Sequence, residues 1–221
     1  NAEIKWLSNG KNFFGELLDE KSIKNNPTNK NVVAWWGMDN FYEKYLNSHS
    51  DDLVLNPRGN PSPVYWSGPG GNIGGGSFQF RNNEFNEADQ IAGSGMSFKV
   101  DYNEKLALTG AQTWAAWIYP NSVGWDQVEG TDRYGIMSKY NWSTDNRSTL
   151  FALRETQLGN GEFYITTYIS PTGGEYNGEW AFSTNGVGGY ININEWTHIA
   201  LVFEPSKRHE IYINGQLSAA K

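Results

Sequence analysis

The stretch from Asn194 to Leu217 constrains the fold of this 221-residue chain more than any other. Two apolar runs, Ile199–Phe203 and Ile211–Ile213, are separated by a polar turn that contains Pro205. The second run ends at Asn214-Gly215, a dipeptide that strongly favours a tight β-hairpin because both residues tolerate a positive φ. The pattern therefore predicts three antiparallel strands in succession.

The composition favours β-structure along the rest of the chain. Aromatic residues make up 15% of the sequence, 10 of them Trp, and there are 25 glycines. Aromatic side chains suit a pleated sheet, while Gly and Asn form tight turns. One core does not need so many Trp, so some are expected to be exposed as platforms on which a sugar ring can stack. The alternative for each single Trp is that it fills the space between two sheets.

Charge and cysteine content exclude several classes of function. The net charge is −7 and no basic run exists, which argues against nucleic-acid binding and against an anionic membrane surface. The absence of cysteine excludes disulfides, zinc–thiolate sites and cysteine nucleophiles. No apolar run approaches the ~20 residues of a membrane span, so no membrane insertion is expected. Because the chain begins at Asn1, it is expected to be a piece of a longer product.

The first 31 residues differ from the remainder. Ile4–Leu7 is predicted to form a short strand, and Asn12–Lys21 a short helix with its apolar residues on one face. A polar linker with Pro27 follows. The sequence thus predicts an N-terminal extension over residues 1–31 and one large domain over residues 32–221.

Short apolar runs separated by glycine-rich turns recur along that domain. Such spacing is typical of an antiparallel sandwich. The predicted strands lie in the segments Val32–Met38, Ser77–Phe80, Gln90–Val100, Asp101–Leu108, Thr113–Pro120, Tyr134–Lys139, Leu150–Arg154, Phe163–Ser170, Ala181–Ser183 and Tyr190–Ile193.

Two of these patterns resemble a known family. Thr113–Pro120 looks like the Thr-apolar-x-Ala-Trp-apolar-x-Pro strand of laminin-G-like and pentraxin-like domains, and Trp196–Gly215 looks like their Trp-x-His strand and Asn-Gly hairpin. The resemblance covers roughly residues 32–217. It implies an all-β, antiparallel concanavalin-A-like jelly-roll sandwich, here with a short N-terminal extension.

The C-terminus departs from this family's pattern. These domains normally continue after the hairpin with two or more strands, whereas this chain stops at Lys221. An open sheet edge is a liability. The sandwich is therefore expected to be cut at its C-terminus, completed by a neighbouring chain, or filled by the N-terminal segment.

Catalytic constellations are weak in the sequence. Concanavalin-A-like folds include glycoside hydrolases and lyases, and retaining hydrolases need two carboxyl groups about 5 Å apart. No Glu-x-Asp-x-x-Glu strand and no Gly-x-Ser-x-Gly elbow is present. His198 is expected to be structural, while His49 and His209 lie in polar turns and are expected to be solvated. A non-catalytic role is predicted, and a polysaccharide-cleaving enzyme is the third alternative.

The resemblance also implies Ca²⁺ at one rim, held by Asp and Asn side chains and loop carbonyls. The candidate ligands are Asp39, Asn40, Asp126 and Asp145. Each of these residues, taken singly, is also explained as a turn-forming residue.

Loop aromatics indicate the ligand-binding surface. Three predicted loops, Val123–Tyr134, Lys139–Ser148 and Pro171–Trp180, combine aromatic rings with Asn, Asp and Gly. Their composition suits a glycan and equally a surface protein, since Trp and Tyr dominate protein interfaces. The predicted ligand-binding residues are Trp125, Asp126, Tyr140, Trp142, Asn146, Tyr176 and Trp180.

Together these features predict a lectin-like carbohydrate-recognition module at an extracellular, cell-surface or virion-surface location. The alternative is a structural or decoration module that makes protein–protein contacts in a larger assembly.

Overall fold

The computed structural model describes residues 32–34, 36, 53–58, 64–66, 77–80, 97–121, 134–141, 146–156, 161–170, 181–184 and 189–221. Residue contacts divide the chain into two compact units. One unit combines Asn1–Asn9 with Gly110–Lys221, and the other is Gly10–Thr109. The predicted boundary at residue 32 stays a prediction. Among the described residues, no helix is long and apolar enough to cross a membrane.

Four strands of the larger unit form one antiparallel sheet. Its order is β13 (Gln216–Ala220), β12 (Arg208–Ile213), β11 (Thr197–Glu204) and β5 (Gln112–Ile118). The last three strands in the chain are thus consecutive antiparallel neighbours, and the hairpin prediction is confirmed.

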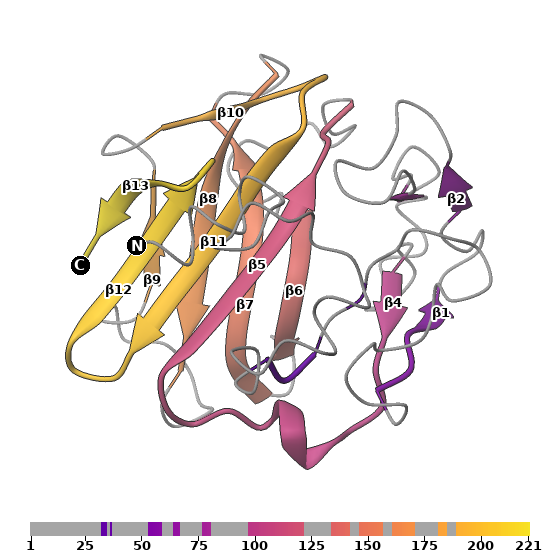
Figure 1. Cartoon of the computed structure of the whole chain (residues 1–221), viewed down its shortest axis with the longest axis vertical. Helices are drawn as coiled ribbons and strands as arrows, with labels where there is room; N and C mark the ends of the chain where they lie inside the picture. Colours follow the sequence, from indigo (N-terminus) through magenta and orange to yellow (C-terminus); the bar gives the residue numbers. More distant parts are fainter. Residues whose placement is uncertain are drawn as a thin grey trace, which may run out of the picture. The chain divides into compact units, whose positions relative to one another are not determined.

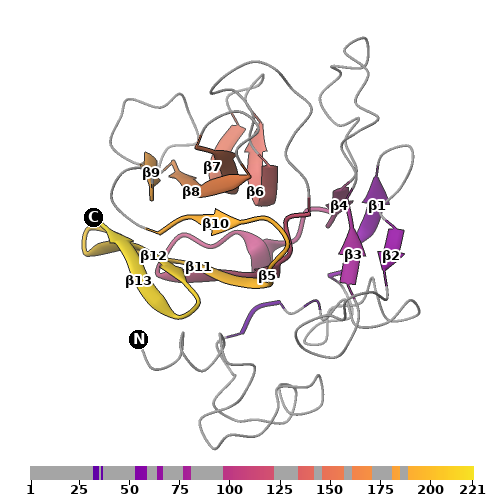
Figure 2. The same ribbon diagram turned by 90° about the horizontal axis from the view of Figure 1, so that it is seen from above.

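A second antiparallel sheet lies against the first. It contains β6 (Tyr134–Asn141), β7 (Asn146–Glu155), β8 (Glu162–Ile169), β9 (Ala181–Ser183) and β10 (Ile191–Asn192). Both β9 and β10 pair with β8. Figure 2 shows the two sheets as stacked layers, so this unit is a β-sandwich.

The core fills the space between the two layers. Alternate residues of β11 (Ile199, Leu201 and Phe203) point into it, because successive side chains on a strand face opposite sides. Each fully buried Leu, Ile or Phe contributes roughly 1.5–3 kcal/mol. The buried members of the cluster are Phe151, Leu153, Phe163, Ile165, Ile169, Ile191, Ile199, Leu201, Phe203 and Ile211.

The outer face of the four-stranded sheet is also apolar at its centre. Ala200, Val202 and Tyr212 form a second buried cluster, and Ala115 packs against it. Strand β11 is therefore buried on both faces. This explains why Ile199–Phe203 is a continuous apolar run and does not alternate with polar residues.

The described part of Gly10–Thr109 contains two strand pairs. Strand β1 (Asn56–Arg58) pairs with β4 (Ser97–Lys99), and β2 (Val64–Trp66) pairs with β3 (Ser77–Gln79). The Phe98 ring meets the Phe78 ring edge-on, with centroids 5.1 Å apart.

The other predicted strands from residue 113 onward are confirmed. Thr113–Pro120, Tyr134–Lys139, Leu150–Arg154, Phe163–Ser170, Ala181–Ser183 and Tyr190–Ile193 correspond in order to β5 to β10 (Figure 1). In Gly10–Thr109, Ser77–Phe80 contains β3 and Gln90–Val100 contains β4.

Two strand predictions are wrong where the structure describes them. Asp101–Leu108 contains a 3₁₀ helix, Glu104–Leu106. The side chain of Asn103 accepts a hydrogen bond from the Lys105 amide, and such local bonds compete with strand pairing. In Val32–Met38, the described residues 32–34 and 36 have irregular backbone. Ile4–Leu7 and Asn12–Lys21 lie outside the described residues.

Candidate functional site

One end of the sandwich is formed by the β6–β7 hairpin. Asn141 lies opposite Asn146 at the end of that hairpin. The Ser170 amide donates to the Ser148 carbonyl at 2.8 Å, and Ala181 lies opposite Tyr168. The residues that flank segments 142–145 and 171–180 therefore lie together. We call this end, marked by Asn141, Asn146, Ser170 and Ala181, the hairpin rim.

The opposite end is the turn rim, marked by Pro120, Tyr134, Gly161 and Asn194. The Ile193 amide donates to the Gly161 carbonyl at 3.2 Å, and the Asn194 amide donates to the Pro120 carbonyl at 2.6 Å. Tyr134 begins β6 at this end. The described residues on either side of segment 122–133 therefore lie at the turn rim. Strand β10, which leads to Asn194, is labelled near the top of Figure 1.

This topology divides the predicted ligand-binding residues. The strand ends that flank segments 142–145 and 171–180, which carry Trp142, Tyr176 and Trp180, lie at the hairpin rim. The described residues that flank the segment with Trp125 and Asp126 lie at the turn rim. These five residues themselves lie outside the described residues.

Tyr140 and Asn146 are strand residues, so the prediction that Lys139–Ser148 is a long loop is wrong. Tyr140 lies opposite Arg147, and Asn141 lies opposite Asn146. Strand pairing continues into polar residues because the two strands form a hairpin, and a β-bulge interrupts its register between Lys139 and Tyr140.

The predicted calcium ligands, Asp39, Asn40, Asp126 and Asp145, all lie outside the described residues. Within the described ranges, no group of three His, Cys, Asp or Glu side chains is arranged to hold a metal ion. The described strand ends on either side of Asp126 lie at the turn rim, and those on either side of Asp145 lie at the hairpin rim.

The turn rim carries aromatic and polar side chains that the sequence reasoning did not select. The rings of Tyr119 and Trp196 lie 5.5 Å apart in a tilted arrangement, and both residues are half-buried. Asn192 Nδ2 donates to Glu195 Oε1 at 3.0 Å, and both side chains are exposed. Thr197 lies opposite Ile118, and Trp196 and Tyr119 are the next residues outward from their two strands. Pairing the two predicted strands in this register would have indicated the aromatic pair.

His198 is buried in the four-stranded sheet, which fits the structural role expected for it. Its ring meets Trp117 at 5.2 Å in a T-shaped contact. Its amide donates to Asn214 Oδ1 at 3.0 Å, and its carbonyl accepts from the Asn214 amide at 2.8 Å. Burial lowers the pKa of His198 to about 4, so the ring is neutral near pH 7. Its Nδ1 has no hydrogen-bond partner in the described structure.

His209 is buried, so the prediction that it is solvated is wrong. It is 5% exposed, and its Nε2 lies 2.8 Å from Thr167 Oγ1. Strand β12 begins at Arg208, so His209 is the first inward-facing position of the series His209, Ile211, Ile213. That alternation is the sequence signal that could have identified it.

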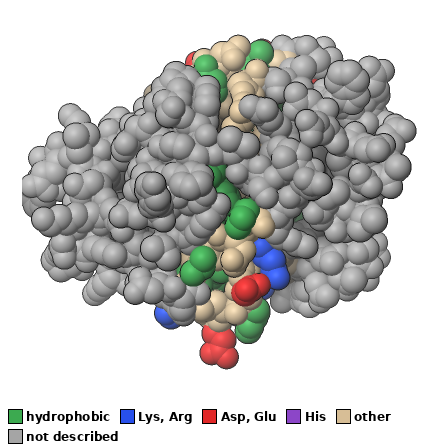
Figure 3. Space-filling model, turned by 90° about the vertical axis from the view of Figure 1, so that its right-hand side faces the viewer, with side chains coloured by type: hydrophobic (Ala, Val, Ile, Leu, Met, Phe, Trp, Pro, Cys, Tyr) green, Lys and Arg blue, Asp and Glu red, His purple; other side chains and the backbone are tan. Residues whose placement is uncertain are grey.

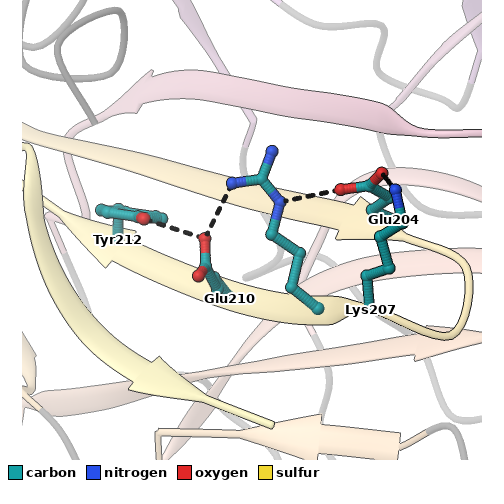
Figure 4. Close-up of polar contacts among 5 residues, drawn as sticks. Glu204, Lys207, Glu210 and Tyr212 are labelled. Atoms are coloured by element: carbon teal, nitrogen blue, oxygen red, sulfur yellow. Dashed lines mark hydrogen bonds and ion pairs between the residues drawn. The ribbon is translucent and has the colours of Figure 1, made fainter.

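A chain of polar contacts follows the outer face of β11 and β12 (Figure 4). Tyr212 donates to Glu210, Arg208 bridges Glu210 and Glu204, and Lys207 contacts Glu204 at 2.6 Å. The Lys207 hydrogen bond lowers the pKa of Glu204, while burial and Glu210 raise the pKa of Tyr212. These shifts keep the Glu204 carboxylate charged and the Tyr212 phenol protonated. A general acid would need a protonated carboxyl group and a tyrosine base a deprotonated phenol, so the pair suits an ion network better than catalysis.

Figure 3 shows one face of the molecule, on which the described side chains form a narrow band. Hydrophobic, acidic and basic groups lie together in this band. The described part of that face is therefore neither uniformly hydrophobic nor uniformly charged.

Comparison with known proteins identifies the family. A family model of the laminin G type, described as the concanavalin A-like lectin/glucanases superfamily, matches residues 92–221. No curated protein and no solved structure matches the chain. The matched region is more than half of the chain and contains both sheets of the sandwich. By this match and by its antiparallel sandwich, the chain belongs to the concanavalin A-like lectin/glucanases superfamily.

Proposed function

We propose that this chain is a non-catalytic carbohydrate-recognition module that acts outside the cell or on a cell or virion surface. The superfamily fits carbohydrate binding in general. The observation that carries the proposal is that the strand ends flanking segments 142–145 and 171–180 lie together at the hairpin rim.

The residue types in those two segments suit a sugar. Trp142, Tyr176 and Trp180 offer aromatic rings on which the apolar face of a pyranose can stack. Neighbouring amide and carboxyl groups bind hydroxyls and fix the orientation of a ligand. Segment 142–145 also contains Asp145, a proposed ligand of Ca²⁺ at the same rim.

The polar network on the outer face supports the absence of catalysis. Glu204 and Glu210 are the two carboxylates that share this face, and Arg208 contacts both of them. A carboxyl group that acts as a general acid needs a raised pKa, whereas the pKa of Glu204 is lowered.

A glycan array tests the proposal, run with Ca²⁺ and again with a chelator. We expect saturable, sugar-specific binding that Trp142→Ala and Trp180→Ala weaken. Trp125→Ala is the matched control and should bind normally, because the described residues that flank its segment lie at the other rim. Retained binding in both hairpin-rim variants would refute the site assignment. Loss on chelation would support the calcium proposal. New reducing or unsaturated ends from a polysaccharide panel would contradict the non-catalytic role.

A structural module is the second candidate function, and the exposure of Leu217 favours it. Leu217 is 53% exposed in β13, which is an edge strand of the four-stranded sheet. An edge strand can pair with a strand from a neighbouring chain. A blank glycan array from well-folded protein, together with self-association that Leu217→Lys abolishes, would favour this function over carbohydrate recognition.

A further inference from the structure

The contact between His209 and Thr167 joins the two sheets through the interior. His209 belongs to β12 and lies opposite Phe203 of β11. Thr167 belongs to β8, where it lies opposite Phe151. The two side chains meet at 2.8 Å between His209 Nε2 and Thr167 Oγ1, and both are buried. A neutral imidazole is thus a polar connection between the inner faces of the two sheets.

The described groups around this imidazole do not favour a positive charge. The Phe203 ring packs edge-on against it at 5.7 Å, and Thr167 carries no charge. Arg208 and Glu210 flank His209 on its own strand, but adjacent strand residues point to the opposite face. The Lys221 cation, which follows directly after β13, acts on His209 and opposes its protonation.

The backbone of His209 also holds the C-terminal end of β13, the edge strand of the four-stranded sheet. The Lys221 amide donates to the His209 carbonyl at 2.9 Å, and the His209 amide donates to the Lys221 carbonyl at 3.0 Å. A displacement of His209 would therefore disturb the pairing of β12 with β13, as well as the contact with β8.

We propose that the His209–Thr167 contact is an acid-sensitive tie between the two sheets, which opens from the β12–β13 edge when His209 takes up a proton. Opening would expose the inner faces of Ile211 and Ala219, both of which are buried in the closed sandwich. The proposal is independent of any glycan, so it can fail or succeed separately from the proposed function.

The direction of the pH effect follows from linkage. Burial, with a smaller effect from Lys221, lowers the pKa of His209 from its ordinary 6.5 to about 4. The opened state therefore binds more protons than the closed state between these two values. The contribution of neutral His209 to the stability of the closed state is complete above pH 6.5. It is lost as the pH falls toward 4 and changes no further below that value. Between pH 7.5 and 5, His209 alone should increase the opening constant roughly 30-fold.

The experiment uses the full chain and measures hydrogen-exchange protection factors of the His209 and Lys221 amides at pH 7.5 and pH 5. We expect protection at these amides to fall roughly 30-fold or more on acidification. His209→Gln keeps a polar side chain that cannot take up a proton in this range, so it should remove that part of the pH dependence. His198→Gln is the matched control, because it changes the other buried histidine and leaves the tie intact.

A direct titration keeps the proposal testable if His209→Gln does not fold. Nuclear magnetic resonance of the wild-type imidazole should show His209 still neutral at pH 5.5. Titration of His209 near pH 6.5 in the folded protein would overturn the proposal. The proposal would also be overturned if the His209→Gln variant folds and its Lys221 amide still loses the same protection on acidification as in the wild type.

Discussion

His198 on β11 and Trp117 on β5 lie directly opposite each other, and their rings meet in a T-shaped contact at 5.2 Å. In this position His198 contributes ring packing and two backbone hydrogen bonds to Asn214. Its Nδ1 contributes no hydrogen bond within the described structure. The ring of His198 therefore matters for packing more than for its polarity.

We predict that His198→Phe changes stability at pH 7 by less than about 1 kcal/mol, because an apolar ring replaces a buried polar atom that lacks a partner. His198→Ala should cost about 2 kcal/mol or more, since it leaves a cavity beside Trp117. Urea denaturation of both variants provides the measurement. A Phe variant as unstable as the Ala variant would mean that the imidazole makes an essential polar contact.

The turn between β12 and β13 gives a second prediction. Asn214 has φ +49 and accepts a hydrogen bond from the His198 amide. Asn214→Gly keeps the backbone conformation and loses the side-chain bond, so it should cost about 1 kcal/mol. Asn214→Ala also takes on the strain of a left-handed conformation, about 1 kcal/mol more. Asn214→Asp retains an acceptor and is the control. Equal stability of the Gly and Ala variants in urea denaturation would contradict the strain argument.

A third prediction concerns the core. Leu201 is 0% exposed and lies in the cluster between the sheets, whereas Leu217 is 53% exposed. Leu201→Ala should cost 2–5 kcal/mol, as large-to-small changes in a packed core usually do. Leu217→Ala, the matched control with the same chemical change, should stay within about 0.5 kcal/mol. Thermal melting of both variants would show whether the two leucines differ in this way.

The polar network on the outer face gives the fourth prediction. Tyr212 is buried, and its hydroxyl donates to Glu210 at 2.9 Å. Tyr212→Phe should therefore cost about 1 kcal/mol. Glu204 makes exposed ion pairs, which water screens, so Glu204→Gln should leave the melting temperature unchanged in physiological salt. A lower melting temperature for Glu204→Gln than for Tyr212→Phe would contradict this order.

Local patterns in the sequence were sufficient to predict the strands of the sandwich. The continuous apolar run Ile199–Phe203 and the dipeptide Asn214-Gly215 each depend on neighbours in sequence, and the structure confirms both. The 3₁₀ helix Glu104–Leu106 was missed because it depends on local hydrogen bonds, among them the one that the Asn103 side chain accepts from the Lys105 amide. A strand propensity sums over many residues and does not register such a bond.

The arrangement of the site could not be predicted in the same way. Trp125 and Trp142 have similar local surroundings in the sequence, since both lie within four residues of an Asn and an Asp. Only the strand register shows that the strand ends flanking the two tryptophans lie at opposite rims. His209 was misassigned for a related reason, since its burial depends on Thr167, which lies 42 residues away in the other sheet.

The division into two rims gives the last prediction, which concerns the coupling between variants. If a glycan contacts Trp142 and Trp180 at one rim, the double variant Trp142→Ala/Trp180→Ala should lose less affinity than the two single losses together, because residues that share a ligand couple. Trp142→Ala combined with Trp125→Ala should be additive within about 0.5 kcal/mol, because distant sites act independently. Titration calorimetry with the glycan identified on the array measures both double-variant cycles. Strong coupling between Trp125 and Trp142 would show that one ligand contacts both segments, and the two-rim assignment would then be wrong.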